Sequence, residues 1–147
     1  MDIGIVTATA ADADAIVRLV RELAGSSGGE SRVDAAYVGR YLGFPGRTVL
    51  LAEAAGERVG LLAFSVNPNL WHAGDGCLIE DLFVQPAWRG KGVGRALMAR
   101  VMAEAARQGW AEVSVSTGRD NREALSLYRG MGLVEEYVLL EKHFPGT

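Results

Sequence analysis

The segment Arg89–Gly94 has the residue types that hold an anion. It reads Arg-Gly-Lys-Gly-Val-Gly, follows the short apolar run Gly76–Val84, and leads into helical spacing that begins at Val93. Backbone N–H groups at the start of a helix lack partners, and the helix dipole adds about half a positive charge there. Arg95 adds a further basic side chain. The sequence therefore predicts an anion site, most commonly a phosphate site, at a strand–loop–helix junction.

The loop matches neither of two common nucleotide-binding motifs. The dinucleotide fingerprint requires GxGxxG, but here Gly94 falls one residue early and Arg95 stands where the last glycine belongs. A P-loop requires Lys followed by Ser or Thr, whereas Lys91 is followed by Gly92. A plain glycine turn stays open as the alternative on this segment alone.

Two adjacent carboxylates, Glu80 and Asp81, interrupt the apolar run before the loop. Gly76 and the Gln85-Pro86 pair bound the run, which predicts a strand buried on both faces. Successive side chains of a regular strand point to opposite faces, so we expect at most one of the two to line a site. The alternation alone does not decide which of the two carboxylates that is.

Hydrophobic spacing predicts the elements that position these residues. The expected strands are Ile3–Thr7, Thr48–Glu53, Arg58–Val66, the central run, Val113–Thr117 and one or two in Leu133–Phe144, and the expected helices run from Ala10 to Gly25, over Val33–Leu42, from Val93 to Gln108 and from Asn121 to Met131. A polar connector, Asn67–Gly74, is expected before the central strand. The pattern predicts a mixed α/β fold with residues 1–147 forming a single domain.

Composition narrows the functional classes. With 147 residues, 49% of them hydrophobic, the chain has the size of one globular domain. The net charge of −3 disfavours nucleic acid as the main partner, and two histidines without ligand spacing predict no metal site. Cys77 is the single cysteine, which fits a reducing cytoplasm. We find no signal-peptide pattern and no membrane-spanning run, so we predict a cytoplasmic protein without a membrane partner.

A second motif lies about thirty residues downstream and helps to identify which anion the glycine loop binds. It reads Asn-x-x-Ala-x-x-x-Tyr-x-x-x-Gly from Asn121 through Tyr128 to Gly132. Together with the glycine loop and the run Leu-Ile-Glu-Asp-Leu-Phe-Val, it resembles the GNAT superfamily of acetyl-CoA-dependent N-acetyltransferases. That run also looks like the diamine and polyamine acetyltransferase branch. The resemblance implies a twisted, mostly antiparallel sheet that is splayed at the cofactor-binding strand and flanked by about four helices, and it implies a homodimer.

The resemblance also implies how acetyl-CoA would bind. The loop would hold the pyrophosphate through backbone N–H groups and basic side chains, with Arg89, Gly90, Lys91, Gly92, Val93, Gly94 and Arg95 as its residues. Leu82, Phe83 and Val84 would pair with the pantetheine arm as another strand does. Asn121 would help to hold that arm, or act as a helix cap, or do both.

Catalytic roles follow from the same resemblance. Glu80 would be the general base for the amine, directly or through a water, and desolvation in the strand is expected to raise its pKa. The alternative role for Glu80 is an anchor for the substrate ammonium without proton transfer. Since position matching to the family favours Glu80 for the site, we predict a structural role for Asp81, which would accept backbone hydrogen bonds. Tyr128 would be the general acid that protonates the leaving thiolate. Alternatively, Tyr128 is a core residue of its helix without a catalytic role. Cys77, in a buried strand without a histidine neighbour, is expected to be inert.

The predicted reaction is transfer of an acetyl group to the primary amine of a small molecule by direct attack in a ternary complex. The alternatives are a protein or peptide acceptor, and a coenzyme-A-binding module without catalysis. The acceptor itself is not given by the sequence. Tyr37 and Tyr41 lie one turn apart on the second helix and are read either as core residues or as a substrate-facing wall. Trp71 is likewise read as an edge of the pocket or as an anchor for its loop.

Overall fold

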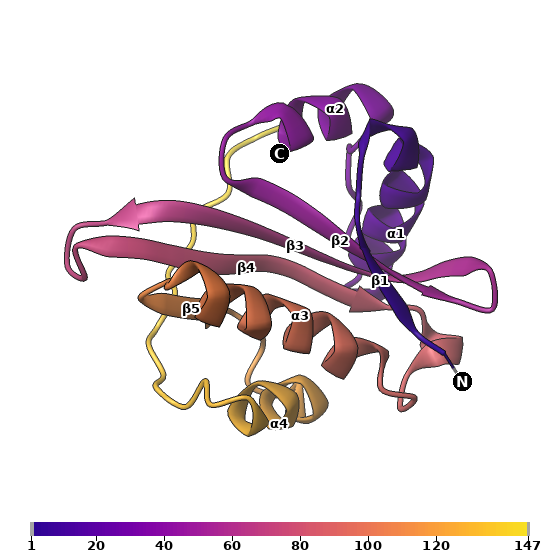
Figure 1. Cartoon of the computed structure of the whole chain (residues 1–147). Coiled ribbons are helices and arrows are strands. Elements are labelled where there is room, and N and C mark those ends of the chain that lie inside the picture. The colour runs from indigo at the N-terminus through magenta and orange to yellow at the C-terminus, as the bar shows by residue number, and fades with distance from the viewer. Residues whose placement is uncertain (1, 147) are drawn as a thin grey trace.

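A computed structural model of the chain describes residues 2–146. Five strands form one sheet in the order β1-β2-β3-β4-β5, and four α-helices flank it (Figure 1). The elements are β1 (Gly4–Thr7), α1 (Ala13–Ser26), α2 (Ala35–Gly43), β2 (Arg47–Ala54), β3 (Glu57–Asn69), β4 (Gly74–Val84), α3 (Val93–Gln108), β5 (Glu112–Val115) and α4 (Arg122–Gly130), with short 3₁₀ turns at Ala10–Asp12 and Pro86–Trp88.

The sheet is mostly antiparallel, as expected, and it opens at β4. Strands β1 to β4 pair antiparallel in succession, whereas β5 lies parallel to β4. The β4–β5 pairing begins at Gly76 and ends where Ile79 meets Val115. Beyond that point β4 continues to Val84 with β3 on one side and, within the described chain, no strand on the other. The predicted splay at the central strand is confirmed.

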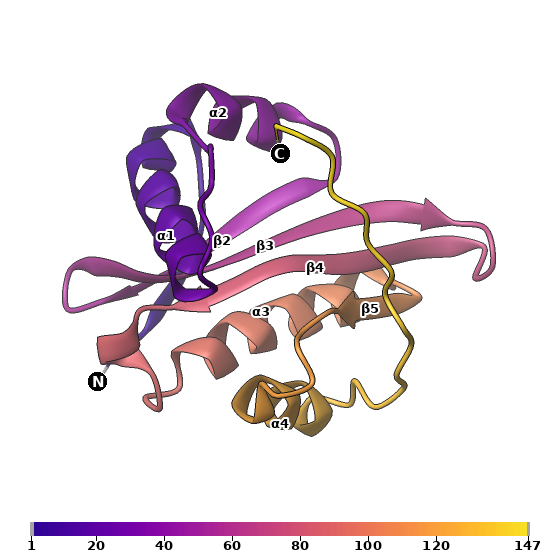
Figure 2. The same ribbon diagram turned by 180° about the vertical axis from the view of Figure 1, so that it is seen from behind.

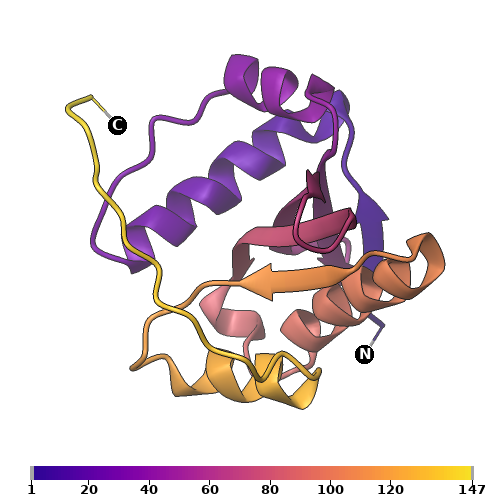
Figure 3. The same cartoon turned by 90° about the vertical axis from the view of Figure 1, so that its left-hand side faces the viewer.

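The helices form two layers, one on each face of the sheet. Helices α1 and α2 cover one face and α3 and α4 the other, which the end-on view shows most directly (Figure 3). Leu19 and Val38 pack with the first face, whereas Leu97, Met98 and Val101 of α3 are buried against the second. Burying each such side chain contributes roughly 1.5–3 kcal/mol, so these stripes fix the helices on the sheet. The helix predicted from Val93 to Gln108 is confirmed.

The turn between β3 and β4 differs from the expected polar connector. The ladder between the two strands continues to the pair Asn69–Gly74, so only a tight turn separates them. Trp71 in that turn is 90% exposed, and it therefore neither anchors the loop nor borders a pocket. His72 pairs with Glu112 of β5 at 3.1 Å. The prediction missed this extension because two polar segments form a long hairpin when each supplies the other's hydrogen bonds.

The segment 133–146 does not form the strands predicted for Leu133–Phe144. It runs extended from α4 toward the α2 side of the molecule, where Arg32 donates a hydrogen bond to the Gly146 carbonyl at 2.6 Å (Figure 2). Tyr137 and Leu140 are 88% and 87% exposed. Apolar residues with strand-like composition form a strand only where a neighbour completes the ladder. In the described chain no strand lies beside this segment.

None of the helices within residues 2–146 combines the length and the apolar character that crossing a membrane requires.

Candidate active site

A groove of about 770 Å³ lies where β4 and β5 separate. That volume is in the range of pockets that hold small organic ligands. Its walls come from five parts of the chain: Leu23, Ser26 and Ser27 of α1; Glu80–Val84 of β4; Trp88–Gly90 and Gly92–Arg95 of the loop and α3; Val115–Gly118; and Asn121, Glu123, Ala124, Leu127 and Tyr128. The splayed sheet thus gathers nearly every residue predicted for the site.

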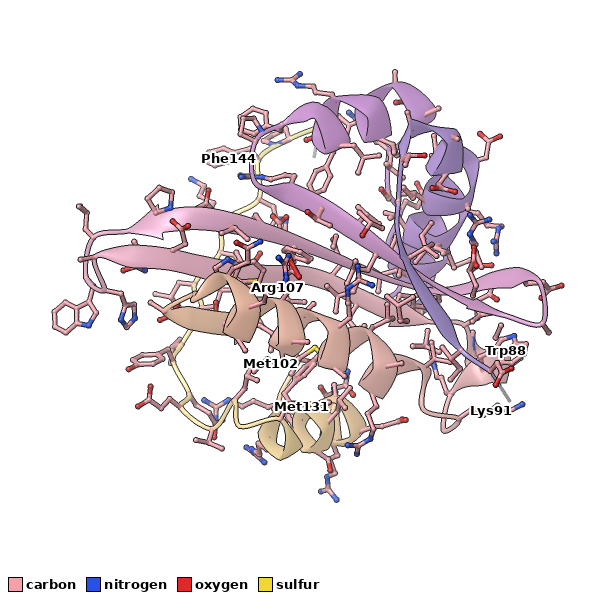
Figure 4. The ribbon with its side chains drawn as sticks, in the orientation of Figure 1. Trp88, Lys91, Met102, Arg107, Met131 and Phe144 are labelled. Atoms are coloured by element: carbon pink, nitrogen blue, oxygen red, sulfur yellow. The ribbon has the colours of Figure 1, made fainter. Side chains whose placement is uncertain are left out.

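Lys91 is the exception among the predicted site residues. It is exposed and does not line the groove described above. Its Nζ lies 5.2 Å from the centroid of the Trp88 ring, an arrangement that Figure 4 shows at the start of α3. A cation over an aromatic face contributes about 0.5–1 kcal/mol at an exposed position. In this structure Lys91 therefore supports the loop from outside.

The start of α3 forms one end of the groove and fits an anion. Gly92 is the N-cap, with φ of 89°, and its carbonyl accepts the first helical hydrogen bond from Ala96 at 3.0 Å. The backbone N–H groups of the first turn therefore have no intrahelical acceptor, and they carry the positive end of the dipole. Arg95 lines the same end of the groove. Donors and charge together suit the pyrophosphate expected there.

We predict that Gly92→Ala weakens acetyl-CoA binding about tenfold, a change of about 1.4 kcal/mol. A left-handed conformation costs a non-glycine residue about 1–2 kcal/mol, so the cap should shift and its N–H groups turn from the ligand. Isothermal titration of acetyl-CoA measures the change. Gly56→Ala is the control, because Gly56 has φ of 77°, has no atom within 4 Å of an added Cβ and does not line the groove. Equal weakening by both variants would contradict the prediction.

The open edge of β4 forms the floor of the groove. Leu82, Phe83 and Val84 pair with β3 on one side only. The Val84 carbonyl accepts a hydrogen bond from Arg89 Nε at 2.9 Å, and the Arg89 guanidinium carbon lies 5.7 Å from the centroid of the Phe83 ring. Arg89 thus satisfies one backbone group of the edge and fixes the loop against the strand. The rest of the edge is placed to pair with an extended ligand arm.

A β-bulge at Glu80 overturns two predictions about β4. Asp81 pairs with Ala63, and Ile79 pairs with Phe64, so Glu80 is an extra residue between them. A bulge breaks the alternation of side chains, and as a result Glu80 and Asp81 both line the groove instead of pointing to opposite faces. Both are exposed, so the strand is not buried on both faces as predicted.

The two carboxylates have different surroundings. Tyr41 of α2 donates a hydrogen bond from its hydroxyl to Glu80 Oε1 at 2.5 Å. Asp81 has a raised pKa, first because nearby protein atoms displace part of the water around its carboxyl group and then because of the charge of Glu80. The backbone hydrogen bonds predicted for Asp81 are not found among the described residues, so a structural role of that kind is not supported.

Helix α4 brings Asn121 and Tyr128 to the opposite wall. Asn121 Oδ1 accepts a hydrogen bond from the Ala124 backbone N–H at 3.2 Å, so this residue caps α4 and lines the groove at once. Tyr128 is only 7% exposed, packs with the α3-side core and also lines the groove. Burial raises the pKa of the Tyr128 phenol, which keeps it protonated well above neutral pH.

Cys77 does not present a usable nucleophile. The side chain is 1% exposed, and burial raises the pKa of its thiol to about 12. At neutral pH the residue is therefore a thiol and not the reactive thiolate. Residues 2–146 also contain no group of three or more His, Cys, Asp and Glu side chains arranged to hold a metal ion.

Several groove residues were not predicted individually from the sequence, although the family resemblance implies that the segment Arg21–Tyr41 shapes the pocket. Leu23, Ser26 and Ser27 lie at the C-terminal end of α1, far along the chain from the motifs, whereas Val115–Gly118 forms the end of β5 and leads toward the motif that begins at Asn121. Nothing in their local sequence signals a ligand. The position of Tyr41 one helical turn from Tyr37 indicated a possible substrate-facing wall. The sequence did not predict the hydrogen bond between Tyr41 and Glu80.

The chain is similar in sequence to known acetyltransferases. The sequence model of the acetyltransferase (GNAT) family matches residues 14–133. The aminoglycoside N(6′)-acetyltransferase type 1 of Stenotrophomonas maltophilia is 30% identical to the chain over 93 residues, which are 61% of this chain and 61% of that protein. The chain thus matches less than two thirds of the length of this curated relative.

Solved structures have the same fold. An aminoglycoside acetyltransferase from an uncultured soil metagenomic sample, in complex with trehalose, superposes with a TM-score of 0.83 at 20% identity, covering 99% of this chain and 97% of its own. The ribosomal-protein-alanine N-acetyltransferase of Brucella melitensis biovar Abortus 2308 superposes with a TM-score of 0.81 at 19% identity, covering 97% and 100%. The family match, which extends over most of the chain, agrees with the splayed sheet and the glycine loop. The chain belongs to the acetyltransferase (GNAT) family.

Proposed function

We propose that this protein is an N-acetyltransferase that moves the acetyl group of acetyl-CoA to a primary amine of a small molecule. One observation carries the proposal. A single groove joins the helix start that suits a pyrophosphate, the open edge of β4, and the side chains Glu80 and Tyr128. Members of this family use acetyl-CoA, and the groove supplies the groups that such a co-substrate requires.

The co-substrate would lie along the groove from α3 toward Glu80. Its pyrophosphate would accept hydrogen bonds from the backbone of Gly92–Arg95, and its pantetheine arm would pair with Leu82–Val84. Asn121 faces the same space from α4. This placement would bring the thioester to the end of the groove where the two carboxylates lie.

The acceptor must lose a proton before it can attack. A lysine-like amine has a pKa near 10.4, so deprotonation at pH 7 costs roughly 4–5 kcal/mol. Glu80 is the group that we assign to this step, directly or through a water. Because its carboxylate is exposed, it can accept the proton and pass it to solvent. The amine nitrogen then bonds to the acetyl carbon in a direct attack.

Collapse of the tetrahedral intermediate breaks the carbon–sulfur bond and leaves a thiolate. Tyr128 is the donor that we assign to that sulfur. Full proton transfer from a phenol to a thiolate with an ordinary pKa near 8.5 is uphill, and a raised phenol pKa makes it more so. We therefore infer that Tyr128 stabilises the sulfur mainly by a hydrogen bond. The nitrogen loses its second proton as the amide forms, and that proton balances the one that the thiolate takes up as coenzyme A leaves.

A small-molecule acceptor is supported by the relatives whose names include aminoglycosides. A protein N-terminus is the second candidate, because a structural neighbour is a ribosomal-protein-alanine N-acetyltransferase. The two acceptors share the same chemistry at the amine. They differ in whether the site must also accommodate the peptide residues that follow the amine.

The test is release of coenzyme A thiol from acetyl-CoA in the presence of polyamines, amino acids, aminoglycosides and alanine-terminated peptides. We expect amine-dependent thiol release with at least one small amine, and a larger kcat/KM for it than for any peptide. A larger kcat/KM for the peptides would favour the second candidate. Tight acetyl-CoA binding by calorimetry, with no thiol released by any acceptor, would contradict catalysis and favour a coenzyme-A-binding module.

A further inference from the structure

Within residues 2–146, Tyr41 is the one side chain outside the groove that forms a hydrogen bond with the side chain of a proposed catalytic residue. It lies on α2, 39 residues before Glu80, and its hydroxyl donates to Glu80 Oε1 at 2.5 Å. Tyr41 is not among the residues that line the groove described above. Its contact with the site therefore runs through the Glu80 carboxylate.

Helix α2 holds Tyr41 firmly enough to direct a partner. Asp34 caps the helix by accepting a hydrogen bond from the Tyr37 backbone N–H at 2.8 Å. Val38 is buried in the core between α1, α2 and the sheet, and Tyr41 packs against the same core. The hydroxyl thus comes from a fixed helix, and a fixed donor can restrict the rotamers of an otherwise mobile glutamate.

Glu80 needs such a restriction because of the bulge. Its neighbours Ile79 and Asp81 are paired with β3, but Glu80 itself is the extra residue of the ladder. Its side chain is also exposed, so packing does not fix its direction. A carboxylate has two oxygens, and a hydrogen bond that occupies Oε1 leaves Oε2 to accept from an amine or a water.

We propose that Tyr41 is a positioning residue that holds the Glu80 carboxylate so that Oε2 faces the acceptor amine. The inference rests on the proposed function. Burial, and then the hydrogen bond to Glu80, raise the pKa of the Tyr41 phenol, so it stays a donor throughout the neutral range. The orientation it imposes is therefore constant and not a pH-dependent switch.

A double-mutant cycle tests the inference. Tyr41→Phe should lower kcat with the best amine by about tenfold or more, the effect of losing a hydrogen bond to a charged group. The KM for acetyl-CoA should not change, because Tyr41 lies outside the groove. In the Glu80→Gln background the same substitution should change kcat by less than about twofold, since the carboxylate it positions is gone. Tyr37→Phe, on a side chain that is 56% exposed one turn earlier, is the matched control and should leave kcat unchanged.

The possible outcomes distinguish failure of the positioning role of Tyr41 from failure of the proposed function. Parental turnover with an unchanged kcat in Tyr41→Phe would overturn the positioning role alone. The same loss in both backgrounds would also overturn it, because that loss would come from general disturbance of α2, which melting temperatures would reveal. No amine-dependent turnover by the parental protein would overturn the proposed function, and the positioning role with it.

Discussion

Glu80→Gln is expected to lower kcat with a primary amine by about 10²- to 10⁴-fold, the usual contribution of a general base. The amide keeps the size and the hydrogen-bonding reach of the carboxylate, but it cannot take the proton of the ammonium. Since Glu80 borders the part of the groove where we propose that the acetyl group binds, and not the proposed pyrophosphate site, the KM for acetyl-CoA should stay within about twofold. Initial rates at pH 7 against both substrates measure the effect.

The pH dependence of the same variant identifies the role. Without a base the reaction depends on the fraction of free amine, which rises about tenfold per pH unit below pH 10.4. The rate of Glu80→Gln should therefore approach the parental rate between about pH 7 and pH 9. Glu57→Gln, at the exposed first residue of β3, is the control for the loss of one charge. A raised amine KM with an unchanged kcat would instead make Glu80 an ammonium anchor.

Tyr128→Phe is expected to lower kcat by about 10- to 100-fold, because the leaving sulfur loses its hydrogen-bond donor. The effect should be smaller than that of Glu80→Gln, since the raised pKa of this phenol disfavours complete proton transfer. For the same reason the donor form persists at and above the ordinary phenol pKa of about 10. Loss of rate from deprotonation of Tyr128 should thus appear only above about pH 10.

The control for Tyr128 is Tyr137→Phe, on a side chain that is 88% exposed in the C-terminal segment and should leave the rate unchanged. If Tyr128→Phe keeps the parental rate at every pH and only lowers the melting temperature, the residue is part of the core and not of the mechanism. If Glu80→Gln and Tyr128→Phe both turn over at the parental rate, the proposed mechanism is wrong.

Local patterns in the sequence predict much of this fold. The spacing of Val93, Leu97 and Val101 requires a helix with one buried face, and Gly92 and Gly109 mark its two ends. The apolar runs around a short turn predict the β2–β3 hairpin. These features depend on residues close in sequence, which is why periodicity and glycine positions suffice. The prediction of a single domain over residues 1–147 stays a prediction.

Features that depend on pairing between distant segments were not predictable. The bulge at Glu80 arises from the register of β4 against β3, and a shift of one residue changes which face a side chain occupies. The contact between Tyr41 and Glu80 joins α2 to β4, which lie far apart in the sequence. Composition alone predicted strands in Leu133–Phe144, although a strand requires a partner that the described chain does not provide.

The most direct test of the account is the position of the coenzyme A sulfur in a crystal structure of the protein with coenzyme A. We expect the pyrophosphate to lie at the backbone of Gly92–Arg95. We expect the sulfur to lie within about 4 Å of the Tyr128 hydroxyl oxygen, a hydrogen-bonding distance for sulfur. The sulfur should also lie on the side of the groove that Glu80 borders. A sulfur more than roughly 6 Å from that hydroxyl, or a pyrophosphate bound away from the start of α3, would contradict it.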